Sequence, residues 1–386
     1  MSLSIAKEEF YKKYGSPVSP PQVYFAPGRV NLIGEHTDYN GGYVFPCALD
    51  FGTYLVIAPN GTDMINLATT NFEFSDSVTI KKMENLGKRW TNYPMGVMDQ
   101  FLKRGFELRG LNMMFSGTVP SGAGLSSSAS IEMVTALALN ELLDFKLDMI
   151  DLIKLSQKAE NEFVGVNCGI MDQFASGMGK KDNAVFINCA TLEYQNIPME
   201  VGDNKIIISN TNKRRGLSGS KYNERRSQCE LAVDLISEAK KISLLGELSM
   251  EQFNRLSHLI KEDVILRRAR HVISENNRVL EAIQALHKND LVRFGQLMNE
   301  SHDSLRMDYE VTGIELDTMV EEARKVPGVL GSRMTGAGFG GCTVSLVNSD
   351  SLDTFIREVG MAYKTKTGIK PDFYTANIGD GARRLE

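Results

Sequence analysis

Residues 120–130 read PSGAGLSSSAS and lead straight into an apolar helical pattern, IEMVTALALNELL, over 131–143. Gly122 and Gly124 allow the backbone to approach a ligand closely and to take unusual dihedral angles. The serines at 126–128 would stand at the helix start, where free backbone N–H groups and the positive end of the helix dipole favour an anion. The stretch therefore predicts a phosphate-binding loop without a P-loop lysine. A serine N-cap after a turn is the structural alternative, but the run is longer than a cap requires.

The first of three glycine-bearing segments in chain order, APGRVNLIGEHTDYNGG at 26–42, begins like a strand and ends in a polar turn. The turn brings Glu35, His36, Asp38 and Asn40 close together in sequence. Donors and acceptors at this spacing suit a ligand with several hydroxyl groups, such as a sugar. From composition alone, a solvated polar hairpin is an equally good interpretation.

A third segment, GVNCGIMDQFAS at 165–176, places Asp172 in apolar company near two glycines. A lone carboxylate in such surroundings is costly unless it is paired or functional. The alternative for Asp172 is an acid at the N-terminus of a short helix. Glu160 precedes this segment at the end of an expected helix.

The composition excludes several classes of protein. The 386 residues carry 43 Lys and Arg against 48 Asp and Glu, a net charge of −5, so a nucleic-acid partner is not expected. No apolar run approaches the ~18 residues of a membrane span, and the first residues do not resemble a signal peptide. The five cysteines form no CxxC and the five histidines no HxxxH or HxH pair, which disfavours a disulfide framework or a transition-metal site. We expect a cytoplasmic protein without a membrane partner.

The element pattern indicates two halves. The first has expected strands at 23–34, 43–49, 53–59, 64–70, 111–115 and 183–189, with helices near 90–102, from 126 onward and at 149–163. The second has expected strands at 205–209, 329–347 (a strand–turn–strand unit) and 373–376, with helices at 222–241, 261–286, 291–305, 313–325 and 352–367. Strands segregated from helices predict an α+β fold of two domains that meet at about 190–205, with the site between them.

Two matches to well-known motifs fail in context. Residues 336–341, GAGFGG, fit GxGxxG, but a strand-like CTVSLVN follows where a dinucleotide-binding loop needs a helix. Asp50-Phe51-Gly52 spells the DFG of protein kinases, but it precedes the glycine loop and the chain has no HRD or Walker A sequence.

Taken together, the three segments resemble the signature motifs of the GHMP kinases, which phosphorylate small molecules. GRVNLIGEHTDYNGG resembles the signature of the galactokinase family, PSGAGLSSSAS is similar to the phosphate loop, and RMTGAGFGGC (333–342) to the C-terminal glycine loop. The resemblance extends over nearly the whole chain, including KYNERR at 221–226. One departure is Ala337, where a third consecutive glycine is expected; its methyl group could tighten the loop without blocking it.

The resemblance implies a fold and an activity. The fold would be the α+β, two-domain GHMP kinase fold, with a ribosomal-protein-S5-domain-2-like half at 1–195, a ferredoxin-like half at 196–386 and the active site in the cleft between them. The activity would be transfer of the γ-phosphoryl group of MgATP to the anomeric hydroxyl of galactose. Galactose and ATP would be the partners of a protein that is a monomer by default.

The resemblance also implies roles for individual residues. Asp172 would be the catalytic base, with Arg29 beside it and beside the phosphates. Ser128 and Glu160 would hold Mg²⁺. Galactose hydroxyls would be bound by Glu35, His36, Thr37, Asp38 and Tyr222. The phosphates of ATP would be wrapped by Gly122, Ala123, Gly124, Leu125, Ser126, Ser127 and Ser128. Trp90 and Tyr93 match a family WxxY segment near the adenine, although core packing is the better interpretation for them.

Two other functions stay open from the sequence. A kinase for another sugar, most plausibly N-acetylgalactosamine, would share the first motif, because specificity rests on contacts around the 2-position that the sequence does not place. A regulatory sensor that binds sugar and ATP without turnover would be expected to carry damage in the phosphate loop or at Arg29 and Asp172. All of these residues are present.

Overall fold

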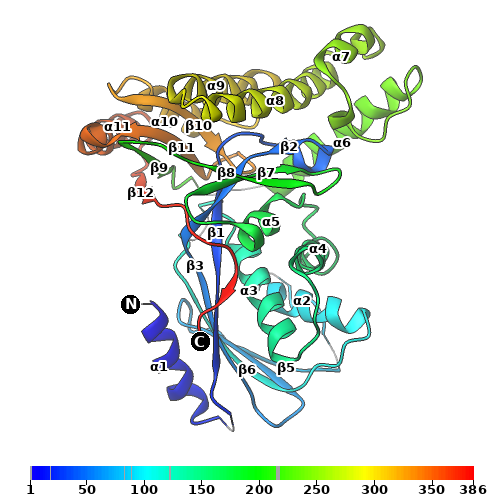
Figure 1. Ribbon diagram of the computed structural model, residues 1–386, viewed down its shortest axis with the longest axis vertical. Coiled ribbons are helices and arrows are strands. Elements are labelled where there is room, and N and C mark those ends of the chain that lie inside the picture. Colours follow the sequence, from blue (N-terminus) through cyan, green and yellow to red (C-terminus); the bar gives the residue numbers. More distant parts are fainter. Residues whose placement is uncertain (1, 18, 82, 88, 121–122, 214–217) are drawn as a thin grey trace.

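Three sheets carry the fold in the computed structural model, which describes residues 2–17, 19–81, 83–87, 89–120, 123–213 and 218–386. The two larger sheets lie toward opposite ends of an elongated molecule (Figure 1). The long strand β1 (Gln22–Asn31) runs from the first of them toward the second.

The N-terminal half is a sheet with helices on both faces. Its elements are α1 (Ser2–Tyr14), β1, β3 (Pro46–Pro59), β4 (Met64–Thr69), β5 (Asp76–Thr79), α2 (Asn92–Lys103), β6 (Leu111–Gly117), α3 (Ser127–Leu142), α4 (Met149–Ala159), α5 (Met171–Met178) and β13 (Arg383–Arg384). The strand order is β13-β1-β3-β6-β4-β5. On β3, Leu55 and Ile57 pack into the core beneath α2, α3 and α4, whereas Val56 and Ala58 pack against α1. Because both faces are covered, the strand is apolar on both sides.

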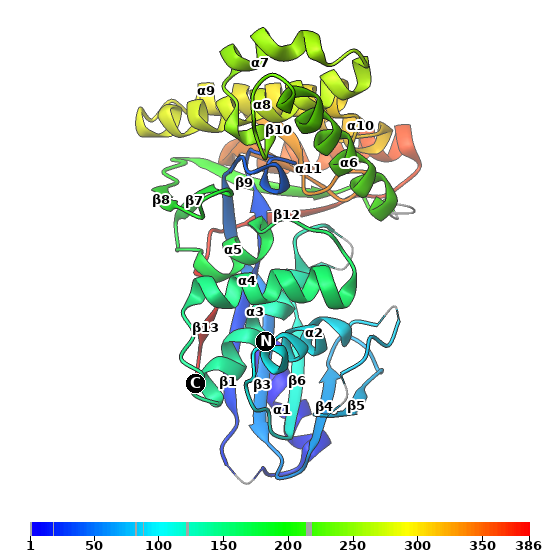
Figure 2. The ribbon, with the colours of Figure 1, turned by 90° about the vertical axis from the view of Figure 1, so that its right-hand side faces the viewer.

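The C-terminal half is an antiparallel sheet in the order β10-β11-β9-β12. Its elements are β9 (Asn204–Asn210), α6 (Ser218–Ser237), α7 (Met250–Leu256), α8 (Asp263–His287), α9 (Leu291–Ser304), α10 (Ile314–Ala323), β10 (Val329–Thr335), β11 (Cys342–Asn348), α11 (Leu352–Thr367) and β12 (Asp372–Ala376). Ile207 of β9 packs with α10 and α11, and its neighbours Ile206 and Ile208 belong to a cluster on the other face. Figure 2 shows α8 and α9 at the far end of the molecule from α1.

The two halves share one apolar cluster. Val30 and Phe45 from the N-terminal half pack in it with Val279 of α8, Leu297 of α9 and Val344 of β11. A small sheet of β2 (Tyr43–Val44), β7 (Asn183–Asn188) and β8 (Tyr194–Pro198) lies between them. The end of the chain then returns to the first sheet, where β13 pairs with β1. The halves are therefore held together by burial as well as by chain connections.

Most of the expected elements are present. The 53–59 and 43–49 segments, expected as two strands, form the short β2 and the continuous 14-residue β3. Gly52 permits this, because a Cβ there would lie 2.0 Å from the carbonyl oxygen of Ala26 on the paired strand. The elements α1, β5, β8 and β13 were not expected, since their sequences are short or mostly polar. None of the helices in the described part of the chain is long and apolar enough to cross a membrane.

Candidate active site

A cavity of about 440 Å³ opens between the two halves, where the first and third segments meet. The third glycine loop and helix α6 complete its wall. The lining includes Arg29, Glu35, His36, Asp38, Tyr39, Tyr93, Glu160, Cys168, Asp172, Tyr222, Gly336 and Ala337. Segments far apart in the sequence therefore converge on one site.

The ion pair between Arg29 and Asp172 lies at the centre of this site. The guanidinium donates from Nε to Oδ1 and from Nη2 to Oδ2, each at 2.8 Å, which is the bidentate geometry of a strong pair. Burial disfavours the charge on Arg29, but the carboxylates of Asp172 and Glu35 raise its pKa, so it stays a cation. The side chain of Asp172 keeps 25% of its surface exposed, toward the cavity.

The loop before α3 is fixed to this pair. Arg29 donates from Nη1 to the carbonyl oxygen of Gly124 at 2.9 Å, and its backbone N–H donates to Leu125 O at 3.1 Å. Ser126 caps the helix with a φ of +58° and donates its hydroxyl to Asp172. Gly28 makes this close packing possible, because a Cβ there would lie 2.7 Å from Leu125 O. The helix begins where the serine run predicts it.

Residues 123–128 do not line the cavity themselves, but several bond to residues that do. Ser127 is exposed at the helix start, and the side chain of Ser128 interacts with Glu160. The predicted phosphate-loop residue Gly122 lies outside the described residues.

Glu160 belongs to a buried group of carboxyl and amide side chains. It begins a π-helical turn, Glu160–Val164, directly after α4, a backbone feature that is frequent at functional sites. The amide of Gln173 donates to Glu160 at 2.7 Å and to Glu132 at 3.0 Å, so one side chain joins two carboxyl groups. Burial, and then the charge of Asp172, raises the pKa of Glu160 to about 7.

Sequence reasoning missed Glu132 and Gln173. Glu132 lies on α3 in an otherwise apolar helical pattern, and it is completely buried. An acid on the core face of a helix was the available signal, since such residues are almost never buried unless they are paired.

The first segment (26–42) supplies a further part of the cavity wall through Glu35, His36 and Asp38. Glu35 accepts a hydrogen bond from the backbone N–H of Gly336 at 2.7 Å, and His36 has its Nδ1 at 2.7 Å from the hydroxyl of Tyr39. Asp38 packs against Gly169, where a Cβ would lie 1.8 Å from its Oδ2. Burial, and then the charge of Asp172, raises the pKa of Asp38 to about 7.

Thr37 differs from its neighbours. Its side chain is completely buried, and Oγ1 lies 2.9 Å from Gly34 O and 2.7 Å from Tyr43 O, so it holds the turn together. It does not line the cavity. Thr37 therefore stabilises the turn and does not face the cavity.

Aromatic rings close one side of the cavity. The ring of Tyr222 lies 5.2 Å from that of Tyr39 and 5.7 Å from that of His36, measured between centroids. Tyr93 also lines the cavity, whereas Trp90 packs edge-to-face on Phe115 of the core, 5.5 Å between centroids. Trp90 therefore has the packing role that the sequence favours.

Comparison with known proteins shows to which family the chain belongs. Residues 8–59 match the family described as "Galactokinase galactose-binding signature", and residues 92–180 and 282–365 match "GHMP kinases N terminal domain" and "GHMP kinases C terminal". A galactokinase of Fusobacterium nucleatum subsp. nucleatum is 52% identical over 369 residues, which cover 94% of this chain and 95% of that protein. A galactokinase of Clostridium tetani is 51% identical, and the match covers 100% of this chain and 98% of that protein. The chain belongs to the galactokinase family.

Solved structures agree with this assignment to the galactokinase family. The crystal structure of Lactococcus lactis galactokinase complexed with galactose matches with a TM-score of 0.96 at 41% identity and covers 100% of both chains. A mevalonate kinase structure matches with a TM-score of 0.65 at 20% identity, covers 92% of this chain and 99% of its own, and shares the fold. The predicted GHMP kinase fold is confirmed.

The third glycine loop of this galactokinase-family chain explains its one departure from the motif. Gly336, Gly338, Gly340 and Gly341 all have positive φ, but Ala337 between them does not. An alanine fits at that position without backbone strain. A dinucleotide-binding loop would be followed by a helix. The GxGxxG match is followed by strand β11 instead, so it is not such a loop.

The buried charge of Asp38 predicts a pH-dependent cost to stability. The pKa of Asp38 is about 7 in the folded protein and near 3.8 when the chain unfolds, so the folded state binds more protons between these values. The contribution of Asp38 to the unfolding free energy therefore becomes less favourable as pH rises through this window. We expect Asp38→Asn to gain about 2–3 kcal/mol relative to the unchanged protein between pH 5 and pH 8.

Urea denaturation without ligands at the two pH values measures this difference. Asp203→Asn, at an exposed loop position, is the matched control and should show no such trend. An Asp38→Asn difference that is constant with pH would refute the raised pKa.

Proposed function

We propose that this chain is a galactokinase, which transfers the γ-phosphoryl group of MgATP to the anomeric hydroxyl of galactose and gives galactose 1-phosphate and ADP. One observation carries the proposal. The bidentate pair of Arg29 and Asp172 lines a cavity that Glu35, His36 and Asp38 of the galactose-binding signature also line.

Asp172 is the proposed base and Arg29 the group that stabilises charge. The guanidinium can stabilise negative charge on the attacking oxygen or on the phosphoryl group during its transfer. A carboxylate is too weak a base to deprotonate a sugar hydroxyl in advance. Proton transfer is therefore late, and positioning and electrostatics supply most of the rate acceleration.

Galactose is proposed to lie against Glu35, His36, Asp38 and Tyr222. The carboxylates of Glu35 and Asp38 are acceptors for sugar hydroxyls, and the tyrosine adds an aromatic face and a hydroxyl. The raised pKa of Asp38 supports this role, because an acid that costs stability in the free protein is typical of a functional site.

ATP is proposed to place its phosphates at residues 122–128, above the N-terminus of α3. Mg²⁺ is proposed to bind Ser128 and Glu160, a hydroxyl and a carboxylate, which are the oxygen ligands this ion prefers. The described residues offer no group of three His, Cys, Asp or Glu side chains that could hold a metal, so phosphate oxygens and water would complete its shell. When bound, the ion would neutralise charge on the phosphates. Burial, and then the charge of Glu160, raises the pKa of the neighbouring acid Glu132, and a cation bound here would relieve this crowding of acidic groups.

The direct test is ADP release with MgATP and galactose, glucose, N-acetylgalactosamine or 2-deoxygalactose. We expect turnover on galactose and none on glucose, since the two differ only in the direction of the 4-hydroxyl. Turnover confined to N-acetylgalactosamine would keep the mechanism and change the substrate. Binding of both ligands without turnover on any sugar would indicate a regulatory sensor instead of an enzyme.

Removing the proposed base should abolish most of the turnover. We expect Asp172→Asn to lower kcat by roughly 10²-fold or more while ATP still binds, because general base catalysis is typically worth that much. Asp203→Asn removes an exposed carboxylate and serves as the control for the substitution. Near-full turnover of Asp172→Asn in steady-state kinetics would show that another group is the base.

The sugar subsite can be tested at Asp38 and at Gly169, the glycine that packs against its carboxylate. In Gly169→Ala the added methyl would push the carboxylate of Asp38 away, so we expect a loss of galactose affinity of roughly 10-fold, similar to Asp38→Ala. Gly117→Ala is the matched control, because its Cβ would meet its nearest neighbour at an ordinary 3.5 Å. Calorimetry with galactose measures both. Unchanged affinity in Asp38→Ala would remove Asp38 from the sugar site.

A further inference from the structure

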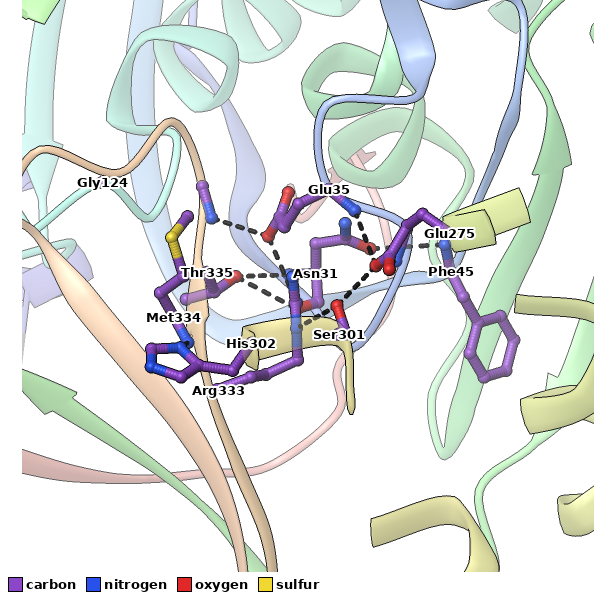
Figure 3. A network of polar contacts seen from close by, with 12 residues as sticks. Asn31, Glu35, Phe45, Gly124, Glu275, Ser301, His302, Arg333, Met334 and Thr335 are labelled. Atoms are coloured by element: carbon purple, nitrogen blue, oxygen red, sulfur yellow. Dashed lines mark hydrogen bonds and ion pairs between the residues drawn. The ribbon is translucent and has the colours of Figure 1, made fainter. Parts of the chain in front are cut away.

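Arg333 of β10 is a completely buried arginine that the proposed reaction does not use. Its Nη1 donates to the carbonyl oxygen of Asn31 at 3.0 Å and lies 3.4 Å from Oε1 of Glu35. Its Nε donates to the hydroxyl of Ser301 on α9 at 3.2 Å. Figure 3 shows the arginine reaching from the C-terminal sheet to the end of β1 and the turn that follows it.

Glu275 of α8 is the second buried charge of this network. Its Oε1 accepts from the backbone N–H groups of Gly34 at 2.9 Å and Glu35 at 3.3 Å, and from the hydroxyl of Ser301 at 2.5 Å. Ser301 therefore joins the two charges (Figure 3). Burial opposes ionisation of Glu275, but Arg278, which donates to its Oε2 at 2.7 Å, acts together with His271, Arg333 and the Ser301 hydroxyl to lower the pKa of Glu275 to about 2.

These contacts fix Glu35 from several directions. Glu275 holds its backbone N–H, and His271 Nε2 lies 3.1 Å from its carbonyl oxygen. The N–H of Gly336 and the guanidinium of Arg333 both meet its Oε1. Among the described residues no hydrogen bond or ion pair falls on Oε2, so this second oxygen is available to accept from a ligand in the cavity that Glu35 lines.

We propose that Arg333 is a positioning residue for the sugar, which holds the Glu35 carboxylate in its binding orientation and fastens the first segment to the third glycine loop. The inference rests on the galactokinase function proposed above. A buried guanidinium needs a carboxylate partner, and the fork of an arginine can meet Asn31, Glu35 and Ser301 at once. A lysine, which is a single point charge, cannot make the same contacts.

The first measurement is steady-state kinetics of Arg333→Lys. We expect the KM for galactose to rise about 10-fold or more while the KM for ATP changes by less than about 2-fold, since the arginine acts through a sugar-binding group. An unchanged KM for galactose would overturn the proposal. Turnover of the unchanged protein on the sugar panel is recorded in parallel, so a failure of the proposed function is seen separately.

A double-mutant cycle separates positioning from a general structural effect. If Arg333 acts through Glu35, the galactose Kd from calorimetry should rise in Arg333→Lys but change by less than about 2-fold when the same substitution is made in Glu35→Gln. An equal loss in both backgrounds would mean that Arg333 only supports the fold, and would overturn the proposal.

Arg324→Lys is the matched control. Arg324 also lies beside β10, where it donates to the carbonyl oxygen of Ser332 and to Asp303, but none of its contacts reaches the first segment. It should leave the galactose Kd unchanged. If Arg333→Lys does not fold, Ser301→Ala takes its place in the cycle, because it removes the Nε contact and leaves both charges in the chain. Its effect on the galactose Kd should likewise disappear in Glu35→Gln, and persistence there would overturn the proposal.

Discussion

A cluster of four acidic side chains governs this site. Glu35, Asp38, Glu160 and Asp172 all line one cavity, and among the described residues of that lining Arg29 is the only arginine or lysine. Removing one partner from a buried ion pair leaves an uncompensated charge, which is strongly destabilising. The bidentate contact between Arg29 and Asp172 is therefore the ion pair within this lining, whereas burial, and then the charge of Asp172, raises the pKa values of Asp38 and Glu160.

The fold holds this arrangement by packing its two halves around it. Arg29 follows an irregularity in the pairing of β1 with β3, where the register shifts between Pro27 and Arg29. The change in register turns the strand at the point where its backbone meets the carbonyl oxygen of Leu125. Beyond that point, β1 enters the apolar cluster that both halves share, through Val30. A cleft between halves that share a core changes shape only at the expense of buried apolar contacts, so its polar groups keep their positions.

The sequence predicted the residues at the centre of this site better than the residues that hold them in place. Motif residues such as Arg29 and Asp172 could be assigned because glycine and serine patterns mark unusual backbone, and the structure brings these two together. The role of Thr37 could not be read in advance, because a hydroxyl that bonds to the main chain looks the same in sequence as one that faces a ligand. The buried acid Glu132 was missed for a related reason. Its partner Gln173 is 41 residues away and becomes a neighbour only when α3 and α5 pack.

The rigidity of Glu35 and Asp38, the proposed acceptors for sugar hydroxyls, bears on which sugar fits. Glu35 is fixed at its backbone and at one carboxylate oxygen, and Asp38 is pressed against Gly169 with no room for a methyl group. A carboxylate that cannot move accepts a hydroxyl only along a narrow range of directions. An epimer that points its hydroxyl elsewhere would leave a desolvated carboxylate without a partner, and such a loss discriminates far more strongly than a lost apolar contact. Selectivity between sugars therefore follows from the fixed positions of the Glu35 and Asp38 carboxylates.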